Sequence, residues 1–106
     1  MYRGTTPTIT FTLPFEASKI EVLSIAFAQK KTPYSEHATL VFEKRLSDCV
    51  PDGNAVRLTL SEADTLRLEC DKEVEIQLRV KYNGVSMASK VYKESVNCIL
   101  KDGSLE

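Results

Sequence analysis

The side chains that can do chemistry are few and scattered in this chain of 106 residues. His37 is the only histidine, and it follows Glu36 in a polar stretch that also contains Pro33. A Ser-His-Asp or Cys-His catalytic group is assembled in space, so the sequence does not exclude one. A single histidine in a polar loop is more often simply solvated. We therefore expect no catalytic residue, and a protein that is not an enzyme.

Pairs of carboxylates are the next candidates, because two of them can supply an acid and a base for cleaving a sugar bond. Glu73 and Glu75 share one face of an expected strand, and Asp71 joins them if the strand begins early. The same face continues with the basic residues Arg79 and Lys81. This pattern is typical of a solvated sheet face with charge pairs between strands.

Loop oxygens at Asp48, Asp52 and Asn54 could serve as calcium ligands. Their spacing does not fit the twelve-residue EF-hand loop. We read this stretch, 48–54, as a turn. Because G-x-G-x-x-G, P-loop and H-E-x-x-H motifs are also missing, we expect no metal and no cofactor.

The three cysteines, Cys49, Cys70 and Cys98, are odd in number, and no two lie within twenty residues of each other. A disulfide scaffold favours an even number, and a zinc site favours a close pair such as C-x-x-C. The sequence therefore predicts reduced, mostly buried thiols and a reducing compartment.

Charge argues against nucleic acid and membranes as partners. The 14 Lys and Arg residues nearly balance the 15 Asp and Glu residues, for a net charge of −1. The basic groups are dispersed and do not alternate with aromatic residues, as single-stranded nucleic-acid sites require. No apolar run is long enough to cross a bilayer, and residues 1–6 do not resemble a signal peptide.

Period-two alternation dominates the sequence and predicts strands. Apolar residues at 9, 11 and 13 alternate with Thr8, Thr10 and Thr12, so this strand has an outer face of threonine. Pro7 and Pro14 bracket it, which suits a strand end or a sheet edge. In the run 73–82, even-numbered positions are apolar and odd-numbered positions are polar, so we expect the even side chains to be buried.

Further strands are expected at about 20–29, 40–45 and 56–60, with a polar loop at 29–37. The alternation changes phase between Val22 and Leu23, which indicates either a bulge or burial on both faces. Ser61 can cap one helical turn at 61–65. Asn83-Gly84 predicts a hairpin turn, and the last run, 85–100, changes phase near 92–95, where it bends or changes sheets.

About seven short strands with one apolar face each predict two sheets packed face to face. We expect an antiparallel β-sandwich of the immunoglobulin or fibronectin kind, with a small barrel as the alternative. One domain spans 1–104, and we interpret residues 105–106 as an expression-vector remnant.

Three segments carry a family resemblance: RGTTPTI (3–9), LTLSEADTL (58–66) and VEIQLRV (74–80). They look like segments of small phage and prophage proteins of Gram-positive gut bacteria. The overall pattern is similar to the N-terminal β-sandwich module of phage upper-baseplate (tail) proteins. The chain departs from those proteins because it has no coiled-coil stem and no receptor-binding head.

The resemblance implies a virion structural or adaptor role in a tail or baseplate, without catalysis. It also implies other phage structural proteins as partners, and a location in the bacterial host cytoplasm during assembly and then in the virion.

Unpaired strand edges suit such a role, because they pair with the backbone of a neighbour. The first and the final strands are the expected edges, with self-association through an edge as one outcome. The expected interface residues are Thr8, Thr10, Thr12 and Tyr92. The alternative function is a module that binds a carbohydrate or another surface ligand through exposed aromatic residues. The aromatic residues in apolar register, expected in the core, are Phe11, Phe27, Phe42 and Tyr82; those not in register are Tyr2, Phe15, Tyr34 and Tyr92.

Overall fold

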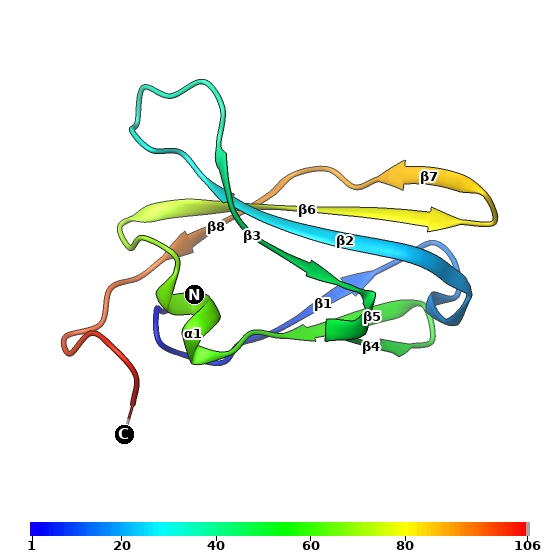
Figure 1. The fold of residues 1–106 in the computed structure, drawn as a ribbon, viewed down its shortest axis with the longest axis horizontal. Helices are drawn as coiled ribbons and strands as arrows, with labels where there is room; N and C mark the ends of the chain where they lie inside the picture. Colours follow the sequence, from blue (N-terminus) through cyan, green and yellow to red (C-terminus); the bar gives the residue numbers. More distant parts are fainter. Residues whose placement is uncertain (106) are drawn as a thin grey trace.

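Two antiparallel sheets lie face to face in the structure, a computed structural model that describes residues 1–105 (Figure 1). The strands are β1 (Thr8–Thr12), β2 (Ile20–Gln29), β3 (Thr39–Arg45), β4 (Cys49–Asp52), β5 (Ala55–Thr59), β6 (Lys72–Tyr82), β7 (Val85–Ala88) and β8 (Tyr92–Val96). The helical segments are α1 (Glu62–Leu66) and the 3-10 turns η1 (Ala17–Lys19) and η2 (Leu46–Asp48). One sheet has the order β1-β5-β4, and the other has the order β3-β2-β6, with β7 and β8 both paired to the far side of β6. The predicted β-sandwich is confirmed.

The strand order is that of the immunoglobulin arrangement, with one difference. In that arrangement strands A, B, E and D form one sheet, and C, F and G with an added C′ form the other. Here β1, β5 and β4 take the places of B, E and D, and within residues 1–105 no strand lies beside β1 in the place of A. Residues Met1–Arg3 run along the other sheet instead, where Tyr2 forms a parallel bridge with Asn97.

The core lies between the sheets and follows the register predicted for β6. Val74, Ile76, Leu78 and Val80 are at most 8% exposed, whereas their odd-numbered neighbours are exposed or half-buried. Among the largest fully buried side chains, Phe27, Leu23 and Ile25 come from β2 of the same sheet, and Leu58, Val56 and Leu60 come from β5 of the facing sheet and the residue that follows it. Burial of this apolar surface is the main force that holds the two sheets together.

The aromatic residues divide largely as expected. Phe11, Phe27 and Phe42 are buried, and the rings of Phe27 and Phe42 stack with centroids 4.6 Å apart. Tyr82 is half-buried at the rim of the core, where Phe15 stacks on it at 4.2 Å. Phe15 therefore serves packing.

The phase change in β2 is a bulge. Ile20 pairs with Tyr82 but Val22 pairs with Lys81, so β2 contains one extra residue there. Val22 is accordingly 53% exposed while Leu23 is 1% exposed. Of the two readings offered by the sequence, the bulge is correct.

The stretch 48–54 contains more than the predicted turn. Residues Cys49–Asp52 form the edge strand β4, which pairs with β5, and only Gly53 and Asn54 make the connection. Pro51 suggested a turn, but an edge strand tolerates a proline because its outward N–H needs no partner in the sheet. Gly53 has a φ of 58°, which suits the tight turn.

The Asn83-Gly84 hairpin is confirmed, with φ values of 51° and 76° that match a type I′ turn. The strand that follows is interrupted at 89–91, slightly before the predicted position, and stays in the same sheet. From β7 to β8 the pairing advances three residues on β6, from Arg79 to Ile76, but four on the other strand, from Ala88 to Tyr92. One residue is therefore looped out.

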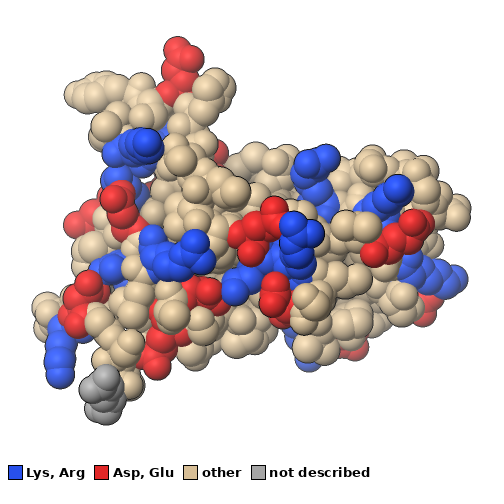
Figure 2. All heavy atoms as spheres, viewed as in Figure 1, with Lys and Arg blue, Asp and Glu red and all other residues tan. Residues whose placement is uncertain are grey.

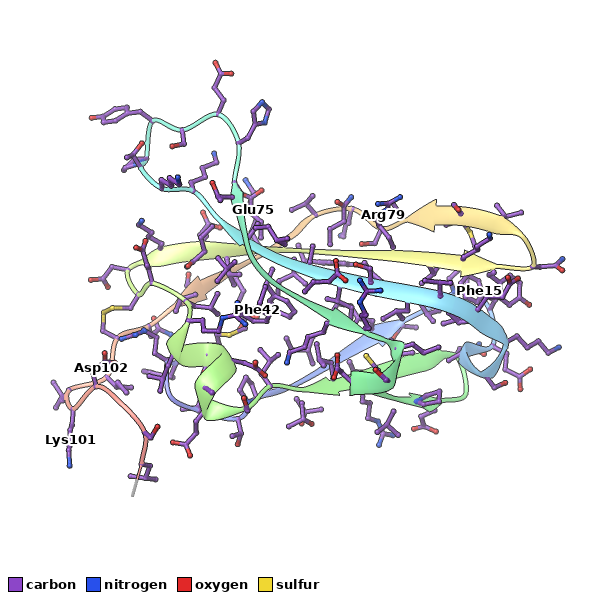
Figure 3. All side chains as sticks on the ribbon, viewed as in Figure 1. Phe15, Phe42, Glu75, Arg79, Lys101 and Asp102 are labelled. Atoms are coloured by element: carbon purple, nitrogen blue, oxygen red, sulfur yellow. A yellow bond between two sulfur atoms is a disulfide. The ribbon has the colours of Figure 1, made fainter. Side chains whose placement is uncertain are left out.

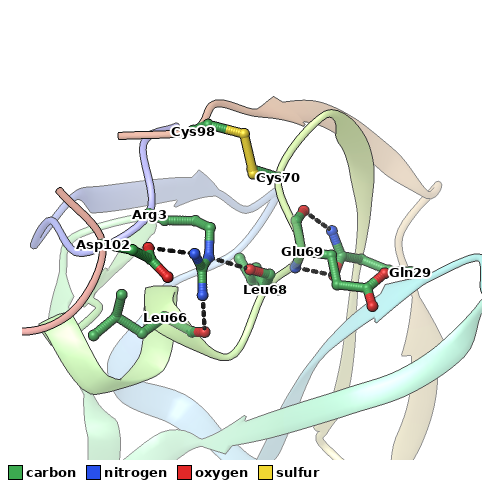
Figure 4. Close-up of a disulfide and its surroundings, with 8 residues drawn as sticks. All are labelled: Arg3, Gln29, Leu66, Leu68, Glu69, Cys70, Cys98 and Asp102. Carbon is green, nitrogen blue, oxygen red and sulfur yellow. Dashed lines mark hydrogen bonds and ion pairs between the residues drawn. A yellow bond between two sulfur atoms is a disulfide. The ribbon is translucent and has the colours of Figure 1, made fainter. Parts of the chain in front are cut away.

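Connections are fixed by side chains. Ser61 caps α1 as predicted: its hydroxyl accepts from the Asp64 backbone N–H at 3.1 Å, and Asp64 accepts from the Ser61 N–H at 3.0 Å. The buried Gln29 side chain forms two hydrogen bonds of 2.8 Å with the backbone of Glu69, where the loop 30–38 leaves β2 (Figures 1 and 4).

Among the described residues no helix has the length and apolar character needed to cross a membrane.

Candidate functional site

The outer edge of β1 has no neighbouring strand within residues 1–105. Pro7 and Leu13, at its two ends, exchange backbone bonds with the β5 side: Leu60 N–H donates to Pro7 and Leu13 N–H donates to Asn54. Backbone groups alternate in direction along an antiparallel strand. The odd-numbered residues of β1 therefore bond to β5, and the N–H and C=O groups of the even-numbered ones point away from the sheet.

Those outward residues are the three threonines that the sequence singled out. Thr8, Thr10 and Thr12 are exposed, and their backbone N–H groups have no partner within residues 1–105. Their side chains lie on the outer face of the sheet, where the Thr8 hydroxyl is 2.8 Å from that of Thr59. The edge thus offers unpaired donors and acceptors that carry no formal charge.

Tyr92, the fourth expected interface residue, lies on the neighbouring edge of the other sheet. Its ring contacts Phe11 of β1 edge-on, with centroids 6.4 Å apart, and it is 42% exposed. Lys90 lies over the same ring at 5.2 Å. The structure therefore brings Tyr92 to the side of the molecule where β1 is open, although β1 and β8 belong to different sheets.

The expected edges differ in how well they are covered. β8 is an edge strand, but Met1–Arg3 lie along its end: Arg3 N–H donates to Asn97 O at 3.1 Å, and Asn97 N–H donates to Met1 O at 2.7 Å. The terminal amine of Met1 also pairs with Glu94 at 3.1 Å. β1 has no comparable cover in the described part of the chain.

The remaining chemical candidates do not converge. His37 and Glu36 lie exposed in the loop 30–38, and neither side chain bonds to another described residue. Asp48 accepts from the Arg45 backbone N–H at 2.9 Å, and Asp52 pairs with Arg57. These two aspartates therefore fix local structure.

Glu73 and Glu75 lie on the outer face of β6, as predicted, and line a surface groove. Glu75 and Arg79 point away from the core, in contrast to Phe42 between the sheets (Figure 3). Lys93 lies opposite Glu75 across the strand pair, and Lys30 borders the groove from the loop. The groove encloses about 550 Å³ and presents both signs of charge, so it selects neither an anion nor a cation. Both signs also alternate over the face of the molecule in Figure 2.

The prediction that all three cysteines are reduced is wrong for two of them. Cys70 and Cys98 form a disulfide, with Cα atoms 5.0 Å apart (Figure 4). Cys49 is a free and buried thiol, as expected. Burial, with a smaller effect of Asp48, raises the pKa of Cys49. Asp71 lies within 4.8 Å of the two bonded sulfurs, but a disulfide has no thiolate to offer a metal.

The Arg3 side chain, near the disulfide, contacts residues from separate parts of the chain. Arg3 donates to the carbonyls of Leu68 at 2.7 Å and Leu66 at 2.9 Å, and it pairs with the Asp102 carboxylate (Figure 4). The hydrogen bond from Arg3 lowers the pKa of Asp102. The Arg3–Asp102 contact connects the segment that follows Cys98 to the first residues of the chain. We interpret residues 105–106 as a vector remnant, and of these Glu106 lies outside the described residues.

The ion pair between Lys44 and Asp64 is another polar contact that the sequence pattern did not predict. Lys44 points inward from β3 and lies 3.0 Å from Asp64 of α1, with both side chains largely shielded. Arg67 lies over the Phe42 ring at 5.1 Å, which covers this end of the core. Burial alone would raise the pKa of Asp64, but hydrogen bonds from Ser61 and Lys44 outweigh it and lower that pKa.

The exposed aromatic residues do not form a stacking platform. Tyr2, Tyr34 and Tyr92 lie on three different segments, and no two of them contact each other in residues 1–105. Comparison of the chain with protein-family models, with curated proteins and with solved structures finds no match.

Proposed function

We propose that this chain is a non-catalytic structural or adaptor protein that acts through protein–protein contacts at the open edge of β1. The observation that carries the proposal is the row of unpaired backbone groups on Thr8, Thr10 and Thr12, in the place where an immunoglobulin sheet has its strand A. An extended segment of a partner gains main-chain hydrogen bonds when it adds to such an edge.

The absence of protective devices on β1 supports this choice of edge. Proteins usually shield free edges with charges, prolines inside the strand or covering segments. β3 carries Glu43, Lys44 and Arg45, β4 carries Pro51, and the end of β8 is covered by Met1–Arg3. β1 has neither a charge nor an internal proline.

The resemblance to phage and prophage proteins supplies the setting of the proposal: a tail- or baseplate-associated protein whose partners are other phage structural proteins. On this proposal the chain is made in the cytoplasm of the bacterial host and then becomes part of the virion. Cys70 and Cys98 would be thiols in the reducing cytoplasm and form their disulfide in the released particle.

The test is the Thr10→Pro variant, made in the phage or prophage that encodes the chain. Proline removes the outward N–H of Thr10, which β5 does not use, so the β1–β5 ladder remains intact. We expect mass spectrometry to find the wild-type chain in purified particles and to find the variant depleted at least tenfold. Thr39→Glu, on the exposed edge of β3, is the control for a change at a different edge and should be incorporated normally. A wild-type chain absent from particles, or full incorporation of Thr10→Pro, contradicts the proposal.

A further inference from the structure

We infer that the occupant of the β1 edge is β1 of a second copy of this chain, paired antiparallel about a two-fold axis at Thr10. This inference rests on the proposed function, since it names the partner of the same edge. Joining two copies in this way extends each three-stranded sheet into one continuous sheet across the dimer.

The sequence of β1 is complementary to itself in this arrangement. With Thr10 opposite its own copy, Thr8 lies opposite Thr12, and Ile9 lies opposite Phe11. Every threonine therefore faces a threonine on the outer side, and every apolar residue faces an apolar residue on the inner side. Thr–Thr and apolar cross-strand pairs both stabilise a sheet.

The backbone directions agree with the side chains. The residues whose N–H and C=O groups point outward are Thr8, Thr10 and Thr12, and these three face one another across the axis. Each of the three residue pairs can then exchange two N–H···O=C bonds. A register shifted by one residue would oppose the outward groups of one copy to the inward groups of the other.

Charge and length single out β1 among the edges. Two copies of β3 would bring Glu43, Lys44 and Arg45 into a pairing seam, whereas β1 carries no charge. β7 is also uncharged, but its four residues direct the groups of only two residues outward. In the dimer, the half-buried Ile9 gains an apolar neighbour.

Pro7 and Pro14 bracket the strand and confine the contact to five residues. A contact of this length buries less area than a standard stable interface of roughly 1,600 Å². We therefore expect association that depends strongly on concentration, with the mass measured by light scattering rising toward twice 11.9 kDa between about 10 μM and about 1 mM.

The register is tested with single cysteines in a Cys49→Ala background, because Cys70 and Cys98 are already bonded to each other. We expect mild oxidation to cross-link Thr10→Cys to itself. Thr8→Cys mixed with Thr12→Cys should cross-link at least tenfold more than either variant alone. In this register two copies of residue 8 lie about 13 Å apart, too far for a disulfide.

Thr10→Glu tests the pairing without a cross-link. The introduced carboxylate lies opposite Arg57 in its own sheet, which favours folding, but in the dimer it also lies opposite the same carboxylate of the second copy. We expect loss of the concentration-dependent rise in mass, with the rise retained by Thr39→Glu as the charge-matched control.

The outcomes separate this inference from the proposed function. A chain that stays monomeric to about 1 mM, or that cross-links through Thr8→Cys alone, overturns the two-fold pairing. If Thr10→Pro is nevertheless excluded from particles, the edge still serves a different partner and the proposed function stands. If Thr10→Pro is incorporated normally, the proposed function fails whatever the oligomeric state.

Discussion

Cys70 lies two residues before Lys72 and Cys98 two residues after Val96, the residue pair at which the β6–β8 ladder ends, and a disulfide joins the two cysteines. Between Cys70 and this last pair, Asp71 has a φ of 61° and its N–H donates to the Val96 carbonyl at 2.9 Å, so the regular ladder does not reach the cysteines. The disulfide therefore closes the sheet just beyond the point where the β6–β8 ladder ends. It encloses β6, β7 and β8 in a loop with a sequence separation of 28.

Removing this bond should destabilise the fold. For a loop of this length, chain entropy predicts a loss of about 3–4 kcal/mol in the free energy of unfolding for the Cys70→Ala/Cys98→Ala double variant. Urea unfolding, monitored by circular dichroism, measures the loss. Reductant should lower the stability of the wild type by a similar amount and leave the double variant unchanged. If the wild type and the double variant are equally stable without reductant, the disulfide does not stabilise the fold.

The register of β6 predicts opposite tolerances at neighbouring positions. Ile76→Asp places a charge without a partner in the dry core, which costs on the order of 4 kcal/mol, a large share of a typical total of roughly 5–15 kcal/mol. Gln77→Asp changes the outer face and loses one hydrogen bond to the Ser89 carbonyl, about 1 kcal/mol. Thermal unfolding compares them, and a more damaging change at Gln77 would mean that the observed register is wrong.

Acid should weaken the fold through Asp64. Its pKa is lower in the folded chain, so the unfolded chain binds a proton first as the pH falls. The stabilisation is complete above the unfolded-state pKa, near pH 4, and is lost as the pH falls through the lower folded value. Asp64→Asn should flatten this part of the stability profile measured by urea unfolding. Asp102→Asn, which removes the other lowered pKa, separates the contribution of the tail. An unchanged profile in both variants would contradict this assignment.

The hairpin turn should respond to a change of one methyl group. Gly84→Ala keeps a φ of 76°, which costs an L-residue roughly 1–2 kcal/mol, and no atom lies within 4 Å of the added Cβ. The loss therefore reports backbone conformation alone. Asn83→Asp should change the melting temperature much less, because aspartate tolerates the same positive φ. Equal effects of the two substitutions would argue against the type I′ turn.

Local patterns were sufficient to predict most of the fold. Three features depend only on neighbouring residues and could therefore be predicted from the sequence: the alternation in β6, the Asn83-Gly84 turn and the Ser61 cap. β4 was missed because Pro51 looks like a turn residue unless the strand is known to lie at an edge.

Long-range contacts explain the other misses. Extending the hairpin register from Asn83-Gly84 without a bulge would pair Cys70 with Asn97. The residue looped out between β7 and β8 shifts the pairing by one, so that Lys72 pairs with Val96, and Asp71 at a φ of 61° interrupts the ladder before Cys70. Neither irregularity is required by the local pattern, so the Cys70–Cys98 bond could not be predicted from it. The Lys44–Asp64 pair likewise needs β3 and α1 to be placed together first.

The Gln29 amide, bonded at both ends to the Glu69 backbone, has a consequence for engineering. These two hydrogen bonds join the end of β2 to the segment before β6 at the root of the loop 30–38. The tip of that loop carries exposed polar side chains and is the natural point for inserting a foreign peptide. We therefore expect that the domain can serve as a display scaffold, with an inserted epitope anchored by the Gln29–Glu69 contact and separate from the open edge of β1.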